Sequence, residues 1–346
     1  MSITPIIDNN NISLILLACK VGNLEIVQFL VKKGANVNAA MTDDGMTALM
    51  WAIKEGHLEI AQLLVEGGAN VNAAKTDNGA TALMWASQEG HLEIVQLLVE
   101  RGANVNAART DDGMTALMWA SWKGHLGIAQ LLIEKGANVN AARTTDGVTA
   151  LMLASQKGHL EIAQLLVEEG ANVNAARTDD GFTTLMIASF KGHLEIAQLL
   201  VEGGANVNAA RTTDGFTSLM GASEAGHLEI AQLLVEGGAN VNAAKTDTGS
   251  TALMWASISG RLEIFEFLVE NGANINATTT SYLPFFGNTA LTYARKFDKD
   301  SIINENRLKI VKFITDREKK TVTNNFWDYI KRNMPFSYIE IPKKNQ

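Results

Sequence analysis

The chain has 346 residues, of which 47% are hydrophobic and 19% charged, and its formal net charge is −8. This composition is typical of a soluble protein, and the longest apolar runs are far too short to span a bilayer. The single cysteine, Cys19, excludes an intramolecular disulfide and fits a reducing compartment, so we expect a cytoplasmic protein.

Residues 1–12 are expected to form a short N-terminal extension, followed by a periodic segment. The extension carries no basic residue followed by a long apolar stretch, so a secretory signal peptide is not expected. In the periodic segment, Gly-Ala-Asn-Val-Asn or Gly-Ala-Asn-Ile-Asn recurs every 34 residues, starting at Gly34, Gly68, Gly102, Gly136, Gly170, Gly204, Gly238 and Gly272. A fixed period of this length is typical of a solenoid, in which each repeat buries its apolar face against its neighbours.

One period, residues 47–79, predicts a helix, a turn, a second helix and an extended loop. Thr47 is a typical N-cap, and the apolar stripe after it ends at Gly56, which can adopt the left-handed conformation that ends a helix. A second stripe, with apolar residues three and four apart, ends at Gly67. The loop closes with Thr-Asp-Asn-Gly at residues 76–79, which favours a tight hairpin turn.

These motifs resemble those of the ankyrin repeat. Thr-Ala-Leu-Met stands where the family has Thr-Pro-Leu-His, at Thr47, Thr81, Thr115, Thr149 and Thr251. The family's Gly-His turn is unchanged at Gly56, Gly90, Gly124, Gly158, Gly192 and Gly226. The resemblance covers roughly residues 13–314 and implies an all-α repeat solenoid of helix-turn-helix units with β-hairpin loops. We expect the methionine that replaces the family's histidine to lie in the core.

The first-helix starts predict about nine stacked repeats, beginning at Ser13, Thr47, Thr81, Thr115, Thr149, Thr183, Thr217, Thr251 and Thr289. We expect the array to span residues 13–316, with divergent first and ninth repeats as caps. The ninth repeat holds two insertions, near residues 281–286 and 298–305. Residues 317–346 form a basic, aromatic tail that is too apolar for a free coil, so we expect it to pack on the last repeat.

Charge is unevenly distributed along the chain. Residues 11–280 carry 16 basic and 29 acidic side chains, whereas residues 281–346 carry 13 basic and 7 acidic ones. The acidic body argues against a nucleic-acid partner, because phosphate binding needs a basic surface. For the basic tail, contact with acidic lipid and contact with the acidic array itself are both open, and no motif decides between them. We interpret the basic loop residues as members of local ion pairs rather than as an anion site, namely Lys75, Arg109, Arg143, Arg177, Arg211 and Lys245.

No pattern of catalytic or metal-binding residues is evident. The six histidines recur with the repeat, so stacking separates them by roughly 10 Å, too far to share one ion. Cys19 lies on an apolar stripe with no histidine nearby in its repeat, which argues against a nucleophile. A glycine-rich phosphate loop and a His-Glu-x-x-His motif are also missing from the sequence. We therefore expect no enzymatic activity, no metal and no cofactor.

Aromatic residues gather at positions that vary between otherwise similar repeats. The family resemblance implies that hairpin tips and the exposed face of the first helix line a concave surface that grips partners, and aromatic side chains are preferred anchors of interfaces. Our candidate partner-binding residues are Trp51, Trp85, Trp119, Trp122, Phe182, Phe190 and Phe216. For the tryptophans that follow a helix-one methionine, we favour half-buried packing over partner contact. For the others we favour an exposed partner contact, because Lys, Gln, Glu, Ala or Ser stand at the same positions elsewhere.

The sequence thus predicts a non-enzymatic, monomeric scaffold that binds another protein. The alternative is an ankyrin-repeat effector of the kind that intracellular bacteria deliver into host cells, where the array would target an activity or membrane contact in the C-terminal segment. The repeats of this chain are nearly identical to one another, as is often seen in bacterial and viral ankyrin proteins. The resemblance further implies hydroxylation by an asparaginyl hydroxylase, if the chain meets one, at Asn72, Asn106, Asn140, Asn174, Asn208 and Asn242.

Overall fold

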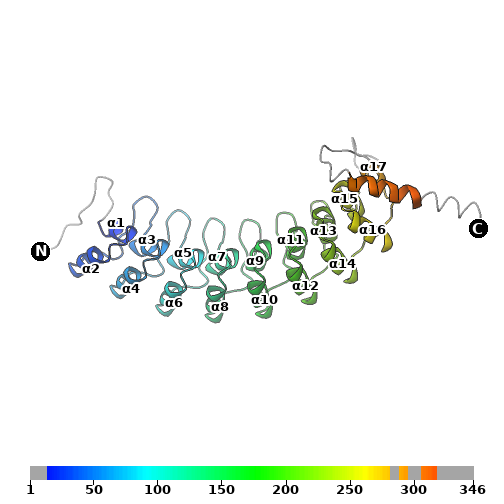
Figure 1. Cartoon of the computed structure of the whole chain (residues 1–346). Helices are drawn as coiled ribbons and strands as arrows, with labels where there is room; N and C mark the ends of the chain where they lie inside the picture. The colour runs from blue at the N-terminus through cyan, green and yellow to red at the C-terminus, as the bar shows by residue number, and fades with distance from the viewer. Residues whose placement is uncertain (1–13, 281–287, 295–304, 318–346) are drawn as a thin grey trace, which may run out of the picture. The chain divides into compact units, whose positions relative to one another are not determined.

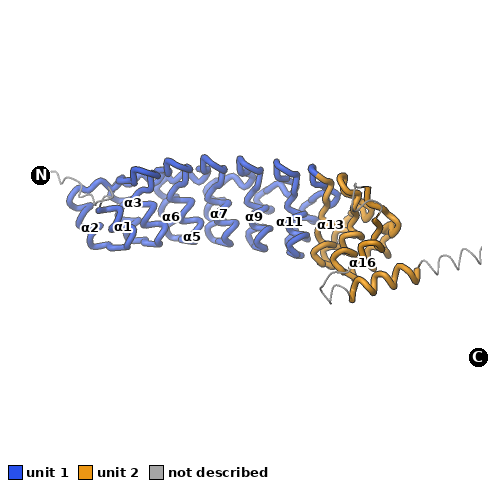
Figure 2. Tube along the Cα trace, turned by 90° about the horizontal axis from the view of Figure 1, so that it is seen from above, with its two compact units in different colours: residues 1–213 blue, residues 214–346 orange. Residues whose placement is uncertain are grey.

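The computed structural model describes residues 14–280, 288–294 and 305–317, and the chain divides into two compact units, residues 1–213 and 214–346 (Figure 2). In unit 1 the helices are α1 (Leu14–Lys20), α2 (Leu24–Lys32), α3 (Ala48–Lys54), α4 (Leu58–Glu66), α5 (Ala82–Glu89), α6 (Leu92–Glu100), α7 (Ala116–Lys123), α8 (Leu126–Glu134), α9 (Ala150–Lys157), α10 (Leu160–Glu168), α11 (Thr184–Lys191) and α12 (Leu194–Glu202). Unit 2 holds α13 (Ser218–Ala225), α14 (Leu228–Glu236), α15 (Ala252–Ile258), α16 (Leu262–Glu270), α17 (Ala290–Ala294) and a helix over residues 305–317.

Unit 1 consists of two layers of helices. The odd-numbered helices α1 to α11 lie side by side in a first layer, and the even-numbered helices α2 to α12 lie beside them in a second layer (Figure 1). Each odd-numbered helix packs against its even-numbered partner and against the odd-numbered helices of the adjacent repeats. The loops between repeats extend past the first layer (Figure 1). This arrangement confirms the all-helical repeat solenoid that the sequence predicts.

In each repeat the first helix is expected to begin at a threonine N-cap and to end at a glycine. The Oγ1 atom of Thr115 accepts a hydrogen bond from the backbone N–H of Met118 at 3.3 Å, which caps α7. Gly124 ends the same helix in a left-handed conformation with a φ of 84°. The predicted N-cap and glycine stop are therefore confirmed in this repeat.

The core lies between the layers and includes the methionine row. These side chains are at most 2% exposed, at Met50, Met84, Met118, Met152, Met186, Met220 and Met254. The small residue that follows two positions later, such as Ala120 or Ala154, is fully buried and lets neighbouring helices approach closely. The prediction that methionine replaces a polar family residue with apolar packing is confirmed.

Six of the predicted β-hairpin loops are each closed by a single bridge rather than by strands. In one of them the antiparallel bridge joins Ala108 and Thr115, and the Arg109 N–H donates to the Met114 carbonyl at 2.9 Å. The loop also contacts the preceding one, because the Thr110 N–H donates to the Asn78 carbonyl at 2.9 Å. Within the described residues no extended strand forms, so the loops are stabilised by their neighbours in the stack.

The last repeat is only partly described. In unit 2, α17 packs against α15, and the Phe313 ring of the 305–317 helix lies 5.9 Å from the Phe265 ring. Arg307 in the same helix donates a hydrogen bond to the Ile258 carbonyl. The predicted N-terminal extension, both insertions apart from residue 305, and the tail after residue 317 lie outside the described residues. The described helices α1 to α16 form eight pairs, and a ninth repeat stays a prediction.

Candidate protein-interaction surface

Six of the aromatic residues that the sequence singles out belong to unit 1. Five lie on first-layer helices and one, Phe182, lies in the loop before α11. Phe190 is 40% exposed, and the other five side chains are half-buried. We call this set the aromatic face: Trp51, Trp85, Trp119, Trp122, Phe182 and Phe190.

Two tryptophans of α7 form the centre of the aromatic face. The rings of Trp119 and Trp122 lie 5.4 Å apart at an angle of 47°. The ammonium groups of Lys123 and Lys157 lie 5.2 and 5.4 Å from the centre of the Trp122 ring. Because Lys157 belongs to α9, Trp122 joins two adjacent first-layer helices through a cation–π contact.

The tryptophans of the earlier repeats are partly covered by lysines. Lys20 lies 4.4 Å from the Trp51 ring, and Lys54 lies 5.4 and 5.2 Å from the rings of Trp51 and Trp85. The Nε1 atom of Trp85 is buried without a hydrogen-bond partner among the described residues. Half-buried packing therefore describes Trp51 and Trp85 in the free protein, and their contact with a partner stays a prediction.

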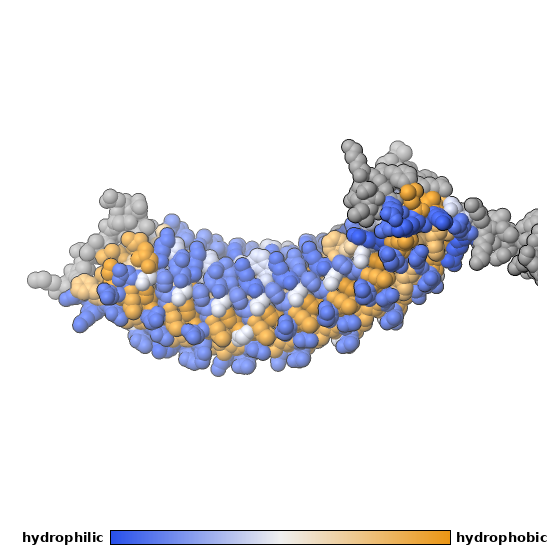
Figure 3. All heavy atoms as spheres, in the orientation of Figure 1, coloured by the Kyte–Doolittle hydropathy of each residue, from blue (hydrophilic) through white to orange (hydrophobic). Residues whose placement is uncertain are grey.

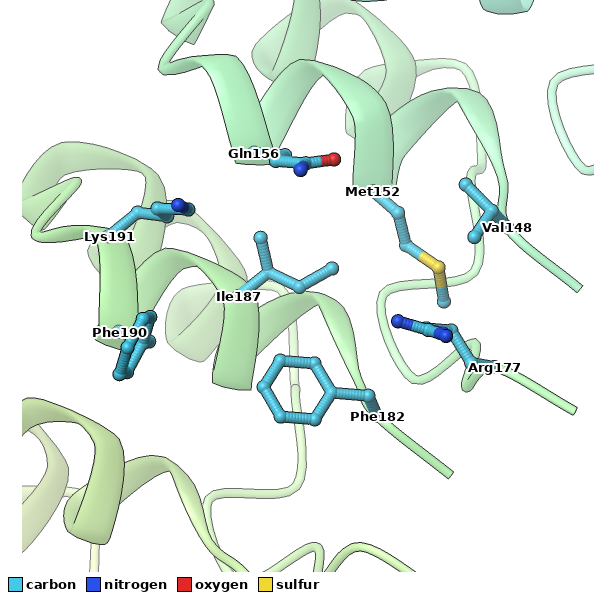
Figure 4. Close-up of a pocket in the computed structure, with 8 residues that line it drawn as sticks. All are labelled: Val148, Met152, Gln156, Arg177, Phe182, Ile187, Phe190 and Lys191. Atoms are coloured by element: carbon cyan, nitrogen blue, oxygen red, sulfur yellow. The ribbon is translucent and has the colours of Figure 1, made fainter. Parts of the chain in front are cut away.

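An apolar hollow of about 150 Å³ lies between α9 and α11. Met152, Ile187 and Phe182 point toward its centre, and the Arg177 guanidinium reaches it from the hairpin loop (Figure 4). Gln156, Phe190 and Lys191 also line it. The sequence signals Phe182 and Phe190 as variable aromatic residues but misses the hollow, because its lining comes from two consecutive repeats whose facing residues are far apart in the chain.

Phe216 differs from the expectation of an exposed contact residue. It is only 7% exposed, and its ring lies 6.5 Å from the Trp255 ring in an edge-on arrangement. The expectation of exposure is wrong because Trp255, one repeat further along, covers the ring. Phe216 therefore packs against Trp255 and is not counted in the aromatic face.

Acidic residues of the hairpin loops are paired with basic residues that the sequence assigns to local ion pairs. Lys75 Nζ lies 3.0 Å from Asp44 of the preceding repeat and 3.1 Å from Asp77. Arg177 Nε donates to Asp179 Oδ1 at 3.1 Å, and this hydrogen bond lowers the pKa of the Asp179 carboxyl below its usual value. The predicted local ion pairing is confirmed for Lys75, Arg109, Arg143, Arg177 and Lys245.

The described contacts of the histidines join neighbouring repeats, and the cysteine is buried in the core. Nε2 of His125 lies 3.2 Å from the Gln88 carbonyl, and Nε2 of His159 lies 3.3 Å from the Trp122 carbonyl, so these two histidines bridge to the preceding repeat. Cys19 is fully buried, and burial raises the pKa of its thiol to about 12. Among the described residues no group of three or more His, Cys, Asp or Glu side chains is placed to hold a metal ion. None of the helices in the described ranges is long and apolar enough to cross a membrane.

The asparagines considered for hydroxylation connect consecutive repeats. Nδ2 of Asn106 donates to the Gly136 carbonyl at 2.9 Å, and its Oδ1 accepts from the Asn138 N–H at 2.7 Å. The same pair of bonds to the following repeat is made by Asn72, Asn140, Asn174 and Asn242. A hydroxylase would have to release these side chains first, and the modification stays a prediction.

The sequence comparison agrees with the helix pairs described above. A family model described as ankyrin repeats, in three copies, matches residues 3–75, 72–143, 141–211 and 209–279. A comparison with curated proteins gives no match. Because the family model covers well over half of the chain and follows its 34-residue period, the chain belongs to the ankyrin-repeat family.

Proposed function

We propose that this protein is a non-enzymatic scaffold that binds another protein through the first-layer surface and hairpin loops of unit 1. Ankyrin repeats are generic protein-interaction modules, which supports a protein partner. The observation that carries the choice of surface is the aromatic face, whose rings lie on the helices and loops that the family resemblance assigns to partners. The cytoplasmic location and the monomeric state expected from the sequence are part of this proposal.

Phe190 and Trp122 are the proposed anchors. Phe190 is 40% exposed and borders the apolar hollow, so a partner can still remove much of its ring from water. Trp122 is half-buried at the contact between α7 and α9. Interface aromatics of this kind commonly lose about 2 kcal/mol of binding free energy or more when truncated to alanine. The effector alternative depends largely on residues 318–346, outside the described part, and no observation on the described residues favours it.

The proposal can be tested by comparing three forms of the whole chain as baits in extracts of the cells that make it. The forms are the parent, the Trp122→Ala/Phe190→Ala variant and the control Leu92→Ala. Leu92 is a matched control because it is 43% exposed on α6, in the second layer. We expect a protein that binds the parent and Leu92→Ala and is lost from the double variant, with thermal melting showing that all three are folded. A folded double variant that retains every partner would refute the proposed surface.

A further inference from the structure

The two layers of unit 1 carry opposite charge. The second-layer helices hold a single basic residue, Lys32, and many acidic ones: Glu25, Glu59, Glu66, Glu93, Glu100, Glu134, Glu161, Glu168, Glu195 and Glu202. The first-layer helices hold a single acidic residue, Glu89, and five lysines: Lys20, Lys54, Lys123, Lys157 and Lys191. The acidic total of the chain therefore hides a basic layer. In the view of Figure 3, hydrophobic residues of unit 1 form a broken band along the helices, bordered by hydrophilic residues.

Helix dipoles favour the lysines at the ends of the first-layer helices but not the glutamates at the ends of the second-layer helices. A lysine in the last helical turn is stabilised by the partial negative charge of the helix C-terminus, and a glutamate there is destabilised. The second-layer helices α4, α6, α8, α10 and α12 nevertheless end in glutamate. On the first layer, α5 ends in Glu89, whereas the equivalent residues of α7, α9 and α11 are lysines. Five of the six first-layer helices of unit 1 thus end in lysine, and α5 is the exception.

Three of these lysines form a row beside the apolar hollow. Lys123, Lys157 and Lys191 end consecutive first-layer helices, and α9 packs against both α7 and α11. None of the three takes part in an ion pair within the described residues. Lys191 lines the hollow and lies 6.0 Å from the Phe190 ring. We call Lys123, Lys157 and Lys191 the lysine row.

We propose that the lysine row and the hollow together bind an acidic segment of a partner protein, which inserts one apolar side chain into the hollow. This inference rests on the proposed function and names the chemistry of the partner. An apolar cavity of about 150 Å³ is known to admit a benzene-sized group, so the hollow matches one aliphatic or aromatic side chain. Carboxylates next to that side chain would pair with ammonium groups that have no ion-pair partner of their own among the described residues.

The net charge of the chain does not oppose this pairing at short range. At physiological salt the screening length is about 8 Å, and packed helices are about 8–10 Å apart, so a bound segment experiences mainly the charge of the layer that it touches. A lipid headgroup surface or a nucleic acid could also meet lysines. Neither supplies side-chain carboxylates together with an apolar side chain on one flexible chain. An acidic polypeptide does, and so it can contact the lysine row and the hollow at once.

The test is a selection of displayed random peptides on the whole chain. We expect the recovered peptides to be rich in Asp and Glu around one apolar residue, and a recovered peptide, synthesised and labelled, to bind more weakly as salt increases. The Lys123→Glu/Lys157→Glu/Lys191→Glu variant should lose about tenfold or more in affinity for that peptide. The control Lys32→Glu/Lys33→Glu/Lys135→Glu makes the same charge change at the ends of α2 and α8 in the second layer and should keep the affinity.

Several outcomes would overturn this inference. Recovered peptides without acidic residues, or equal losses in both charge variants, would show that the lysine row does not select the ligand. Binding of phosphatidylserine vesicles or of single-stranded oligonucleotide that depends on the lysine row, without any peptide binding, would replace the partner class. If cellular partners still depend on Trp122 and Phe190 in these cases, the proposed function stands and only the partner chemistry fails.

Discussion

At Gly124 two features disfavour a side chain, the left-handed backbone conformation and the close approach of His159, and variants at two glycines can separate them. Its φ of 84° lies in the left-handed region, and a Cβ atom there would lie 2.6 Å from Cε1 of His159. Gly136 has nearly the same φ, 85°, but no atom within 4 Å of an added Cβ. The conformation is therefore shared by the two glycines, whereas the close approach to the next repeat belongs to Gly124 alone.

We predict that Gly124→Ala destabilises the protein more than Gly136→Ala. The backbone conformation alone should cost about 1–2 kcal/mol in either variant. Displacement of the His159 ring should add about 1–3 kcal/mol in Gly124→Ala, because it breaks packing between repeats. Urea unfolding followed by circular dichroism measures the difference. Equal losses in the two variants would contradict the role of the histidine contact.

The reactivity of the Cys19 thiol measures whether α1 is packed as described. Its sulfur is fully buried in α1, and burial raises the thiol pKa to about 12, well above the usual value near 8.5. We predict that alkylation by iodoacetamide in the native protein stays slow from about pH 7 to 10 and that its rate is still rising at about pH 10, because the thiolate is a minor species at every pH below the raised pKa. In denaturant, alkylation should become fast around the usual pKa. Rapid native labelling at neutral pH would contradict the burial of this side chain.

At the scale of elements, the asparagine bonds couple each loop to the next. Asn106 makes its two side-chain bonds to the following repeat, whereas the side-chain oxygen of Asn104 accepts a bond from the Asn106 N–H within the same loop, at 3.0 Å. Because a repeat array is stabilised mainly by its neighbour interfaces, the two asparagines should differ in their effect on cooperativity.

We predict that Asn106→Ala lowers the unfolding free energy by about 1–3 kcal/mol, since it removes two hydrogen bonds worth about 0.5–1.5 kcal/mol each. It should also broaden the urea transition, because repeats on its two sides become less coupled. Asn104→Ala should cost about 1 kcal/mol and leave the slope of the transition unchanged. A sharp transition in Asn106→Ala, with the stability of Asn104→Ala, would show that the bonds do not couple repeats.

The helix pairs could be predicted from local sequence because each signal acts within a few residues. Thr115 caps the helix that follows it, Gly124 ends that helix, and Met118 is buried by its place on the apolar stripe. The exposure of aromatic residues could not be read in this way. Phe216 is covered by Trp255, and Trp122 is approached by Lys157, each from the following repeat. Such contacts depend on how equivalent positions differ between neighbours.

For the whole molecule, the net charge does not show how acidic and basic residues are distributed between the layers. Residues 11–280 have an excess of acidic side chains, from which an acidic body follows. Assignment of each residue to a helix and a layer shows that in unit 1 the helical acids lie almost entirely on the second layer. Thirty-four-residue periodicity places equivalent residues in one column, so a few substitutions in consecutive repeats, such as Lys123, Lys157 and Lys191, produce a local surface of opposite sign.

The most direct test of the proposed binding surface is site-specific photo-crosslinking in the cells that make the chain. A photoreactive phenylalanine derivative replaces Phe190 in one form and Leu92, of similar exposure on the second layer, in another. We predict that the form with the probe at position 190 crosslinks to a partner protein, at an acidic segment of that partner, and that the form with the probe at position 92 does not. Crosslinks to the same partner from position 92 alone would contradict binding through the first layer of unit 1.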